Sequence, residues 1–392
     1  MPSEFNSSFL QELEMGLRDL ETRTQRRDLA EVCGVNFCSN DYLGLAEHPA
    51  LKESVLQAVK DSVRVGGTGS RLLSGHAAIW SEVEEEFASF AGTEAALYFG
   101  SGYVANLGLI SSLIDRDDLI FSDELNHASL IDGIRLSSAC KVIYPHLDLD
   151  MLESELREHN THPGRKLIVT ESIFSMDGDV APLGELLSLA DRYGAGLVVD
   201  EAHATAVCGP SGKGIAMQAS VVPGLTAVVH TCGKGLGSAG AFVCGSTTLK
   251  EHLINHARTF IFSTAMPPYM AAQVRAALRL SLTMDKQREA LRSHSQQLVS
   301  DLRNVGWDTT GSSTHIIPVV LGENDAAQSV AEYLRHEGFA VRAIRPPTVP
   351  KGAARLRFSL TCTIAPRELA RLEESLNAWR AQHHHLAVAE RA

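Results

Sequence analysis

Short apolar runs alternate with stretches of helical periodicity through the middle of the chain. Each run is four or five residues long and apolar on both sides, and most runs are separated by amphipathic patterns such as 183–193. Strands that are buried on both faces are typical of a parallel sheet covered by helices. The pattern therefore predicts an α/β fold whose mainly parallel, seven-stranded sheet has strands at 95–99, 119–122, 141–144, 167–170, 196–199, 226–230 and 240–244.

The two ends of the chain follow other patterns. Residues 8–30 and 50–63 have the spacing of amphipathic helices, and residues 267–305 form one long helical stretch that predicts a connector out of the sheet. Beyond this connector, strands are predicted near 316–321, 339–344 and 355–360, and helices near 326–337 and 366–381. We therefore expect an N-terminal helix and arm (1–45), a large sheet domain (46–285) and a smaller C-terminal α+β domain (286–392).

The composition narrows the class of protein. The 392 residues carry a formal charge of −12 with no offsetting basic block, so neither a nucleic acid nor an anionic membrane is expected as a partner. No apolar run approaches the length that spans a bilayer. The seven cysteines contain no C-x-x-C pair, which favours free thiols in the cytoplasm over a disulfide framework or a zinc site. No metal site is expected at His383-His384-His385, where a solvated tail is predicted.

A lysine lies in a glycine-rich loop directly after the strand predicted at 226–230. The loop is Thr231-Cys232-Gly233-Lys234-Gly235-Leu236-Gly237. Glycines let the backbone turn sharply and let a flat ligand come close. A lysine in such an open, partly dry setting can hold an aldehyde as a Schiff base. Taken alone, the stretch is equally compatible with an ordinary loop and a solvated lysine.

Other polar residues follow the neighbouring strands, and the carboxyl ends of parallel strands meet at one edge of a sheet. A buried Asp200 carboxylate can hold a pyridine nitrogen protonated, and His203 can hydrogen-bond a phenolic oxygen or a carboxylate. His127 could stack on a flat ring, and Gly102-Tyr103 opens a helix whose free N–H groups favour an anion. Each residue alone has a structural explanation, such as a helix N-cap for Asp200. Together, at successive strand ends, they indicate one active site.

The order of these motifs resembles that of the α-oxoamine synthases. The motifs are Asn126-His127-Ala128-Ser129, Ser175-Met176-Asp177-Gly178-Asp179, Asp200-Glu201-Ala202-His203 and Thr231-x-Gly233-Lys234-Gly235. Members of this family are fold-type-I pyridoxal-phosphate enzymes that condense an amino acid with an acyl thioester and release CO₂. The resemblance covers nearly all of residues 36–380. It implies an aminotransferase-like fold, pyridoxal 5′-phosphate as the cofactor, and a homodimer with shared active sites.

The resemblance also implies a role for each residue that matches a family motif. Lys234 would form the Schiff base and shuttle the proton at Cα, Asp200 would pair with the pyridine nitrogen, and His203 with the ring oxygen region. His127 would stack on the cofactor. The other implied contacts to the cofactor and its phosphate are Gly102, Tyr103, Ser175, Thr231 and, from a neighbouring subunit, Ser263 or Thr264.

The implied substrate contacts lie at the two ends of the chain. Asn40 and Arg357 would hold the amino-acid carboxylate, and Thr348 would contact the acyl substrate. Spacing alone leaves Arg355 and Arg357 open, because both lie on one face of the last strand; the family motif favours Arg357. For the far carboxylate of the acyl chain the implied residue is Arg23, with Arg26 as the alternative.

Three further stretches favour one particular activity among those of the family that the sequence resembles. They are Asn40-Asp41-Tyr42-Leu43-Gly44-Leu45, residues 260–268 and residues 343–352. They imply a decarboxylative condensation of L-alanine with a pimeloyl thioester, carried by CoA or by an acyl-carrier protein. The alternatives are glycine C-acetyltransferase or another α-oxoamine synthase, and a regulatory protein that binds the cofactor without catalysis. The chain departs from the family at Thr361-Cys362-Thr363, where Ala-Ala-His is common, and at Phe262, where a common tyrosine hydroxyl is missing.

Overall fold

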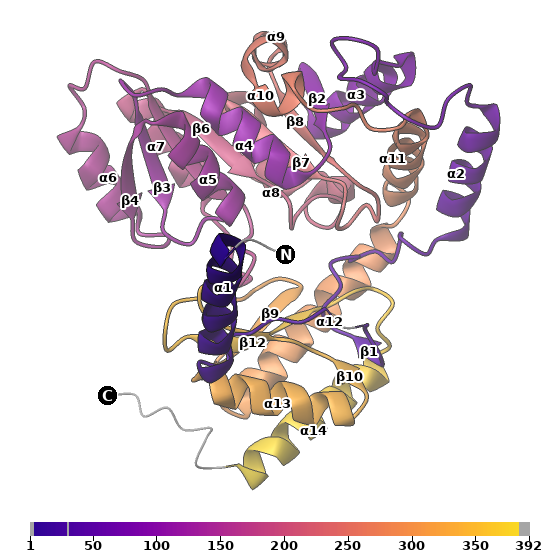
Figure 1. Cartoon of the computed structure of the whole chain (residues 1–392), viewed down its shortest axis with the longest axis vertical. Helices are drawn as coiled ribbons and strands as arrows, with labels where there is room; N and C mark the ends of the chain where they lie inside the picture. Colours follow the sequence, from indigo (N-terminus) through magenta and orange to yellow (C-terminus); the bar gives the residue numbers. More distant parts are fainter. Residues whose placement is uncertain (1–3, 30, 384–392) are drawn as a thin grey trace.

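The computed structural model describes residues 4–29 and 31–383. A seven-stranded sheet forms the centre of its large domain (Figure 1), in the order β2-β8-β7-β6-β5-β3-β4. Only β8 runs antiparallel to its neighbours. The strands are β2 (Ala95–Phe99), β3 (Leu119–Asp123), β4 (Cys140–Tyr144), β5 (Lys166–Glu171), β6 (Gly196–Asp200), β7 (Ala227–Thr231) and β8 (Ala241–Gly245). The predicted mainly parallel, seven-stranded sheet is confirmed.

Helices cover both faces of this sheet, because alternate residues along each strand face opposite cores. In β6, Val198 packs with α4 (Gly102–Leu113) and α5 (Ala128–Ser137). Its neighbours Leu197 and Val199 pack with α6 (Leu149–Glu158) and α7 (Leu183–Tyr193) on the other face. With both faces filled by apolar side chains, the carboxyl edge of the sheet is where polar groups can gather.

Helices at one end of the sheet link the large domain to the rest of the chain. α3 (Ala78–Ala91) and α11 (Pro268–Ser281) pack beside β2 and β8, and α2 (Pro49–Asp61) lies against α11. The shorter helices are α8 (Ile215–Gln218), α9 (Thr247–His256) and α10 (Arg258–Ile261).

The prediction of one continuous helical stretch over 267–305 is wrong. The chain breaks after α11 and continues as α12 (Asp285–Asn304). Leu278 of α11 packs in the large-domain core, whereas Leu291 and Leu298 of α12 pack in the small-domain core, so the helix axis changes direction between them.

The small domain is an antiparallel three-stranded sheet backed by helices. Its strand order is β11-β12-β9, formed by Ala343–Ile344, Ala354–Ser359 and Ile316–Gly322. Together with α12, the helices α13 (Asn324–His336) and α14 (Pro366–Gln382) bury Leu334, Phe358 and Trp379 in one core. The strand predicted near 339–344 is split: β10 (Phe339–Ala340) pairs with β1 (Val35–Asn36) of the N-terminal arm, and β11 pairs with β12.

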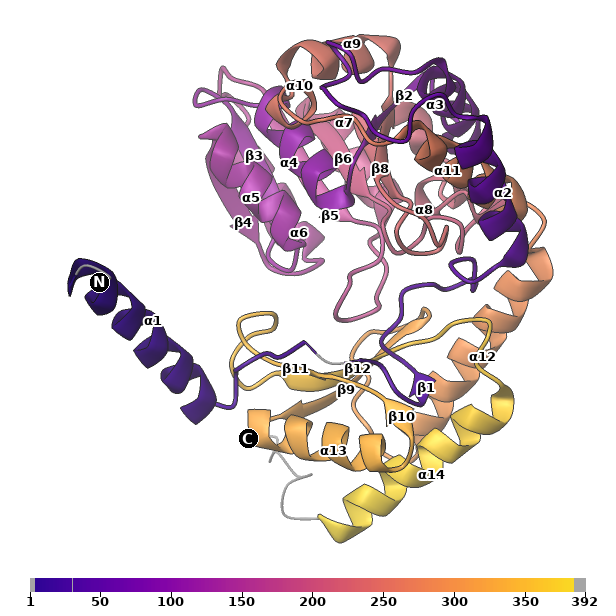
Figure 2. The same cartoon turned by 45° about the vertical axis from the view of Figure 1, so that its right-hand side comes forward.

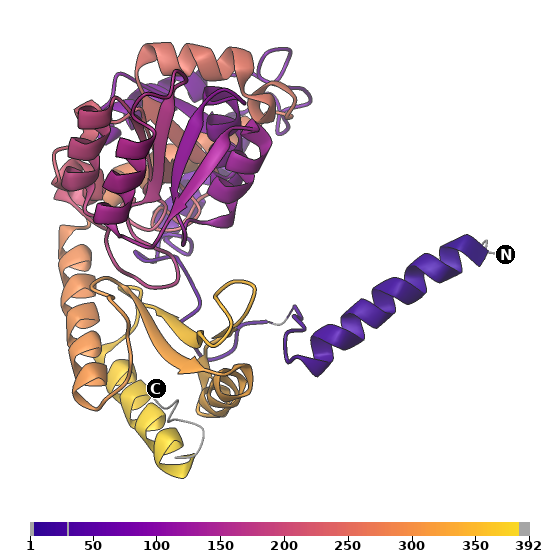
Figure 3. The same cartoon turned by 90° about the vertical axis from the view of Figure 1, so that its left-hand side faces the viewer.

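The N-terminal helix α1 (Glu4–Thr22) projects away from both domains (Figures 2 and 3). It is shorter than the predicted 8–30, because residues after Thr22 run along α13, where the Thr24 hydroxyl donates to Asp325 Oδ1 at 2.7 Å. Large apolar side chains of α1 are exposed, among them Phe9 and Leu13. None of the described helices is long and apolar enough to cross a membrane. His384 and His385, expected in a solvated tail, lie outside the described residues.

Candidate active site

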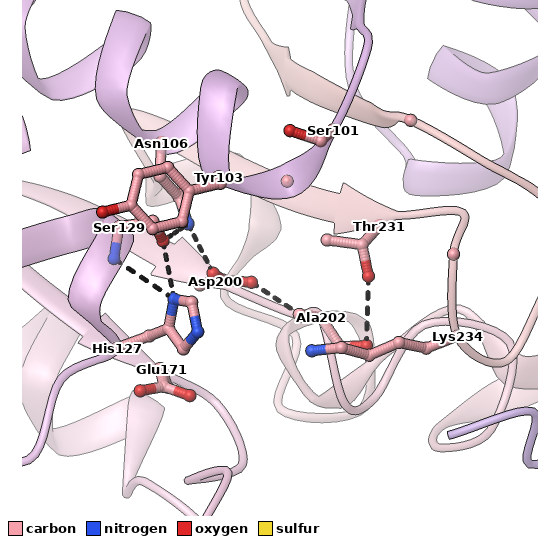
Figure 4. Close-up of a pocket in the computed structure, with 13 residues that line it drawn as sticks. Ser101, Tyr103, Asn106, His127, Ser129, Glu171, Asp200, Ala202, Thr231 and Lys234 are labelled. Atoms are coloured by element: carbon pink, nitrogen blue, oxygen red, sulfur yellow. Dashed lines mark hydrogen bonds between the residues drawn. The ribbon is translucent and has the colours of Figure 1, made fainter. Parts of the chain in front are cut away.

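The carboxyl ends of the strands surround a cavity of about 240 Å³ (Figure 4). Figure 4 shows the Lys234 amine pointing into the space that His127, Asp200 and Glu171 bound. The lining residues are Ser101, Gly102, Tyr103, Asn106, His127, Ser129, Glu171, Asp200, Ala202, Thr231, Gly233, Lys234 and Gly240. Six of the predicted site residues therefore lie together: Gly102, Tyr103, His127, Asp200, Thr231 and Lys234.

Asp200 sits at the end of β6 and is only 4% exposed. Its two oxygens accept hydrogen bonds from Asn106 Nδ2 at 2.7 Å and from the Ala202 N–H at 2.8 Å. Asn106 also donates to Ser129 Oγ at 2.9 Å. Two donors on this buried carboxylate fix the direction of its two oxygens. Asn106 is not among the predicted site residues, although its place one turn into the helix that opens at Gly102 was a usable signal.

Lys234 is held beside two acidic groups and a histidine. Its amine lies 2.9 Å from His203 Nε2. Burial lowers the pKa of Lys234 to about 8, although the Asp200 and Glu171 carboxyls oppose the shift. At neutral to mildly basic pH a substantial fraction of the amine is therefore uncharged, which is the form that attacks an aldehyde or removes a proton.

Glu171 is a second pocket residue that the sequence analysis did not select. It ends β5, one residue past the predicted strand, and is 2% exposed. Burial, together with the nearby Asp200 charge, raises the pKa of Glu171 well above its usual value. Its Oε1 atom has no hydrogen-bond partner among the described residues. A buried polar atom without a partner at a pocket wall indicates that a ligand group belongs there.

His203 lies just beyond the cavity and connects it to the N-terminal arm. Its Nδ1 is 2.6 Å from the Tyr42 hydroxyl, which donates to Asn40 Oδ1 at 3.1 Å. Burial and the Lys234 charge lower the pKa of His203 well below its usual value, so the ring is neutral. With Nδ1–H donated to Tyr42, Nε2 remains as the acceptor that faces Lys234. Tyr42 was not selected from the sequence, because it lies far along the chain from His203.

Arg357 completes this chain of contacts from the small domain. It is 9% exposed, and its Nη1 and Nη2 atoms donate to Asn40 Oδ1 at 3.2 and 3.3 Å. Its Nε donates to the Ser175 carbonyl, which places Ser175 beside Arg357 rather than on the pocket wall. Arg355 is engaged elsewhere, in an ion pair with Asp177 at 2.6 Å. Of the two arginines that the strand spacing left open, Arg357 is the one next to Asn40.

The N-terminus of α4 closes the pocket opposite Lys234. Ser101 caps this 12-residue helix by accepting from the Val104 N–H at 3.2 Å. A Cβ on Gly102 would lie 2.5 Å from Thr231 Cγ2, so only glycine allows this close approach. Free N–H groups at a helix N-terminus favour an anion such as a phosphate. The Tyr103 side chain is partly exposed and donates to Asp132.

Several predicted site residues lie outside the cavity. Ser263 and Thr264 are exposed, next to Phe262, which is 70% exposed. Arg23 pairs with Asp19 at 3.1 Å on the surface. Thr348 instead accepts a hydrogen bond from Arg27 Nη2 at 3.3 Å. The roles of these residues stay predictions.

A flat, anionic aldehyde fits the pocket that these residues form. The α4 N-terminus could hold a phosphate, Asp200 could pair with a ring nitrogen and Lys234 could react with an aldehyde carbon, while His127 lines one side of the cavity. The unpartnered buried oxygens of Glu171 and Asn106 also line the cavity. The described residues contain no group of three or more His, Cys, Asp or Glu placed to hold a metal ion.

Fold and site together define a pyridoxal-phosphate-dependent enzyme of fold type I. The family model for class I and II aminotransferases matches residues 33–376. A relative from Geobacter sulfurreducens, an 8-amino-7-oxononanoate synthase, is 48% identical over 86% of this chain and 86% of its own length. The chain therefore belongs to the family of the 8-amino-7-oxononanoate synthases.

Solved structures support the fold and the cofactor. A serine palmitoyltransferase from S. paucimobilis with bound PLP is 27% identical, covers 98% of both chains and superposes with a TM-score of 0.86. An 8-amino-7-oxononanoate synthase from Francisella tularensis is 27% identical, covers 90% of this chain and 99% of its own, and gives a TM-score of 0.78. The cofactor of this chain is pyridoxal 5′-phosphate, as predicted.

Proposed function

We propose that the protein condenses L-alanine with a pimeloyl thioester, giving 8-amino-7-oxononanoate, CO₂ and the free thiol, as a step of biotin biosynthesis. One observation carries the proposal: the Lys234 amine, 2.9 Å from His203, points into a pocket that also holds Asp200. The name of the relatives supplies the product, and the substrate pair is the one that the family resemblance implies. In the reaction a carbon–carbon bond forms at the alanine Cα, the thioester C–S bond breaks, and the alanine carboxylate leaves as CO₂.

Each of the pocket residues has a separate role in this reaction. When bound, the cofactor supplies an electron sink for the carbanion at Cα. Asp200 keeps the pyridine nitrogen protonated, so that the sink stays strong. Lys234, with its pKa at about 8, removes and returns the proton at Cα. His127 covers one side of the pocket, and His203 would hydrogen-bond the ring oxygen of the bound cofactor.

Binding of the amino acid is assigned to the small domain. Arg357 and Asn40 are hydrogen-bonded to each other, and a guanidinium is suited to a carboxylate because it donates two parallel hydrogen bonds. A carboxylate that enters this position would replace the Asn40 oxygen as the acceptor. The amino acid would then lie between Arg357 and Lys234, with its Cα near the amine.

The acyl chain is assigned to the region between Thr348 and the N-terminal arm. Arg27 donates to Thr348, and Arg345 donates to the Thr24 carbonyl, so the N-terminal arm contacts the segment to which we assign the acyl substrate. Arg23 remains our candidate for the far carboxylate, with Arg26 as the alternative. Their guanidinium groups are partly exposed and pair with surface carboxylates, Arg23 with Asp19 and Arg26 with Glu21.

We further propose a homodimer with shared sites in the cytoplasm. The hydroxyl of the exposed Ser263 or Thr264 is suited to contact the phosphate of a neighbouring subunit. The projecting helix α1 exposes apolar side chains that a partner would cover. The seven cysteines are free thiols, as expected in a reducing compartment.

A panel of substrates tests the proposal. Alanine, glycine and serine are each combined with pimeloyl, acetyl and palmitoyl thioesters of CoA and of an acyl-carrier protein, and thiol release is followed. The highest kcat/KM is expected for alanine with a pimeloyl thioester. Glycine with acetyl-CoA is the outcome expected of a glycine C-acetyltransferase, and serine with palmitoyl-CoA that of the serine palmitoyltransferases with the same fold. Lys234→Ala should release no thiol in any combination; turnover by this variant would refute the role of the lysine.

A further inference from the structure

The loop of residues 172–180, between β5 and α7, bridges the two domains. On the small-domain side, the Gly178 carbonyl accepts from Thr314 Oγ1 at 2.9 Å. The Asp177 carboxylate accepts from Arg355 at 2.6 Å, and the Ser175 carbonyl accepts from Arg357 Nε. The backbone of this 172–180 loop therefore holds the Nε side of the Arg357 guanidinium.

On the large-domain side, a histidine between two carboxylates holds the same loop. His146 follows β4, and its Nε2 lies 2.8 Å from Asp179 Oδ2 at the end of the loop. Its Nδ1 lies 2.9 Å from Asp123 Oδ1, at the end of β3. The ring packs edge-on against Phe174 of the loop, with centroids 4.4 Å apart. One side chain thus ties together the ends of β3 and β4 and the loop after β5.

Two observations indicate that this contact is charged. Both ring nitrogens face carboxylates, and only the protonated imidazolium has a hydrogen to donate from each. Burial alone would lower the pKa of His146, but hydrogen bonds to Asp123 and Asp179 outweigh it and raise the pKa to about 10. The imidazolium is therefore present throughout the neutral range, and its charge-assisted bonds are of the stronger kind.

A short, continuous path joins His146 to Arg357. Within the loop, the Phe174 N–H donates to the Asp179 carbonyl at 3.1 Å and the Gly178 N–H donates to the Phe174 carbonyl at 2.9 Å, so the loop is a closed turn. Ser175 lies inside this turn. A shift of Asp179 would therefore move the Ser175 carbonyl and, with it, the Arg357 guanidinium.

We propose that His146, clamped between Asp123 and Asp179, is a positioning residue that fixes the 172–180 loop and thereby the arginine that receives the amino-acid carboxylate. This inference rests on the proposed function, because it assigns that carboxylate to Arg357. His146 does not line the cavity; its effect is on the binding of the amino acid and not on the proton transfer at Lys234.

The test uses the holoenzyme and the variant His146→Gln. Glutamine has no charge and reaches only one of the two carboxylates well. The KM for alanine should rise about tenfold, the lower end of the effect of losing one charge-assisted hydrogen bond, while kcat and the KM for the thioester change less than about threefold. Hydrogen exchange of the 172–180 amides should become faster, and that of β7 should not change. His336→Gln, at an exposed histidine of α13, is the matched control and should behave as the wild type.

Every other outcome argues either against the positioning role of His146 or against the proposed function on which that role rests. An unchanged alanine KM with unchanged loop exchange overturns the proposal, and so does an equal loss in both substrates without faster loop exchange. If His146→Gln does not fold, Asp179→Asn serves instead, because it keeps the shape of the side chain and removes one charge. This variant should also raise the KM for alanine and speed up hydrogen exchange of the 172–180 amides. If neither quantity changes, the proposal is overturned. If the wild type itself releases no thiol with any substrate, the proposed function fails, whereas the exchange comparison still tests the clamp.

Discussion

The most specific prediction concerns how the Arg357 side chain binds the amino-acid carboxylate. Its guanidinium is almost fully buried and uses all three nitrogens, toward Ser175, Ser359 and Asn40. Replacing it by lysine keeps the positive charge but leaves one donor group in place of a planar fork. Arg357→Lys is therefore expected to bind the amino-acid carboxylate through a single contact.

The size of the effect follows from that lost contact. A hydrogen bond to a charged group contributes about 1.5–3 kcal/mol, and about 1.4 kcal/mol corresponds to a factor of ten. The kcat/KM for alanine should therefore fall roughly 10- to 150-fold, mostly through KM, with the KM for the thioester little changed. Initial rates of thiol release, with each substrate varied in turn, give these parameters.

Arg355 provides the matched control two residues away on the same strand. Its partner is the Asp177 carboxylate at 2.6 Å, and a lysine can keep that ion pair. Arg355→Lys should therefore cost clearly less alanine kcat/KM than Arg357→Lys. An Arg357→Lys enzyme with the wild-type KM for alanine, or a larger loss from Arg355→Lys, would show that Arg357 does not bind the carboxylate.

Three further predictions concern the pocket and the core. Asn106→Ala removes the donor 2.7 Å from Asp200, so kcat should fall roughly tenfold or more, measured as thiol release at saturating substrates. The rate at which the cofactor-free protein takes up pyridoxal phosphate, followed by visible absorbance, should rise with pH, reach half of its maximum near pH 8 and level off about one unit higher. The reason is that Lys234, with its pKa at about 8, loses its proton over that range; a rate that falls toward pH 8 would contradict it. Leu372→Ala, in the small-domain core, should lower the free energy of unfolding by about 2–5 kcal/mol in denaturant titrations, whereas Leu136→Ala at the surface should change it little.

Local patterns were enough to predict the sheet. Its strands are short, mostly apolar runs, so each of the seven is recognisable within a few residues of its own sequence, although the edge strand β4 is largely exposed. The rule that parallel strands end at one edge then placed His127, Asp200 and Lys234 around one pocket before any contact was known. Periodicity was less informative where the chain changes direction without changing its pattern, as between α11 and α12.

The sequence by itself determined the α/β architecture, the lysine loop and the group of polar strand ends, because these depend on neighbours within one or two elements. Only the tertiary structure decided which residues complete the site. Tyr42 meets His203 across 161 positions, and the choice between Arg355 and Arg357 depends on which one Asp177 engages. The clamp of Asp123, His146 and Asp179 likewise joins the end of β3, the segment after β4 and the loop after β5. Such contacts depend on how the elements pack in three dimensions, so the spacing of residues along the chain does not reveal them.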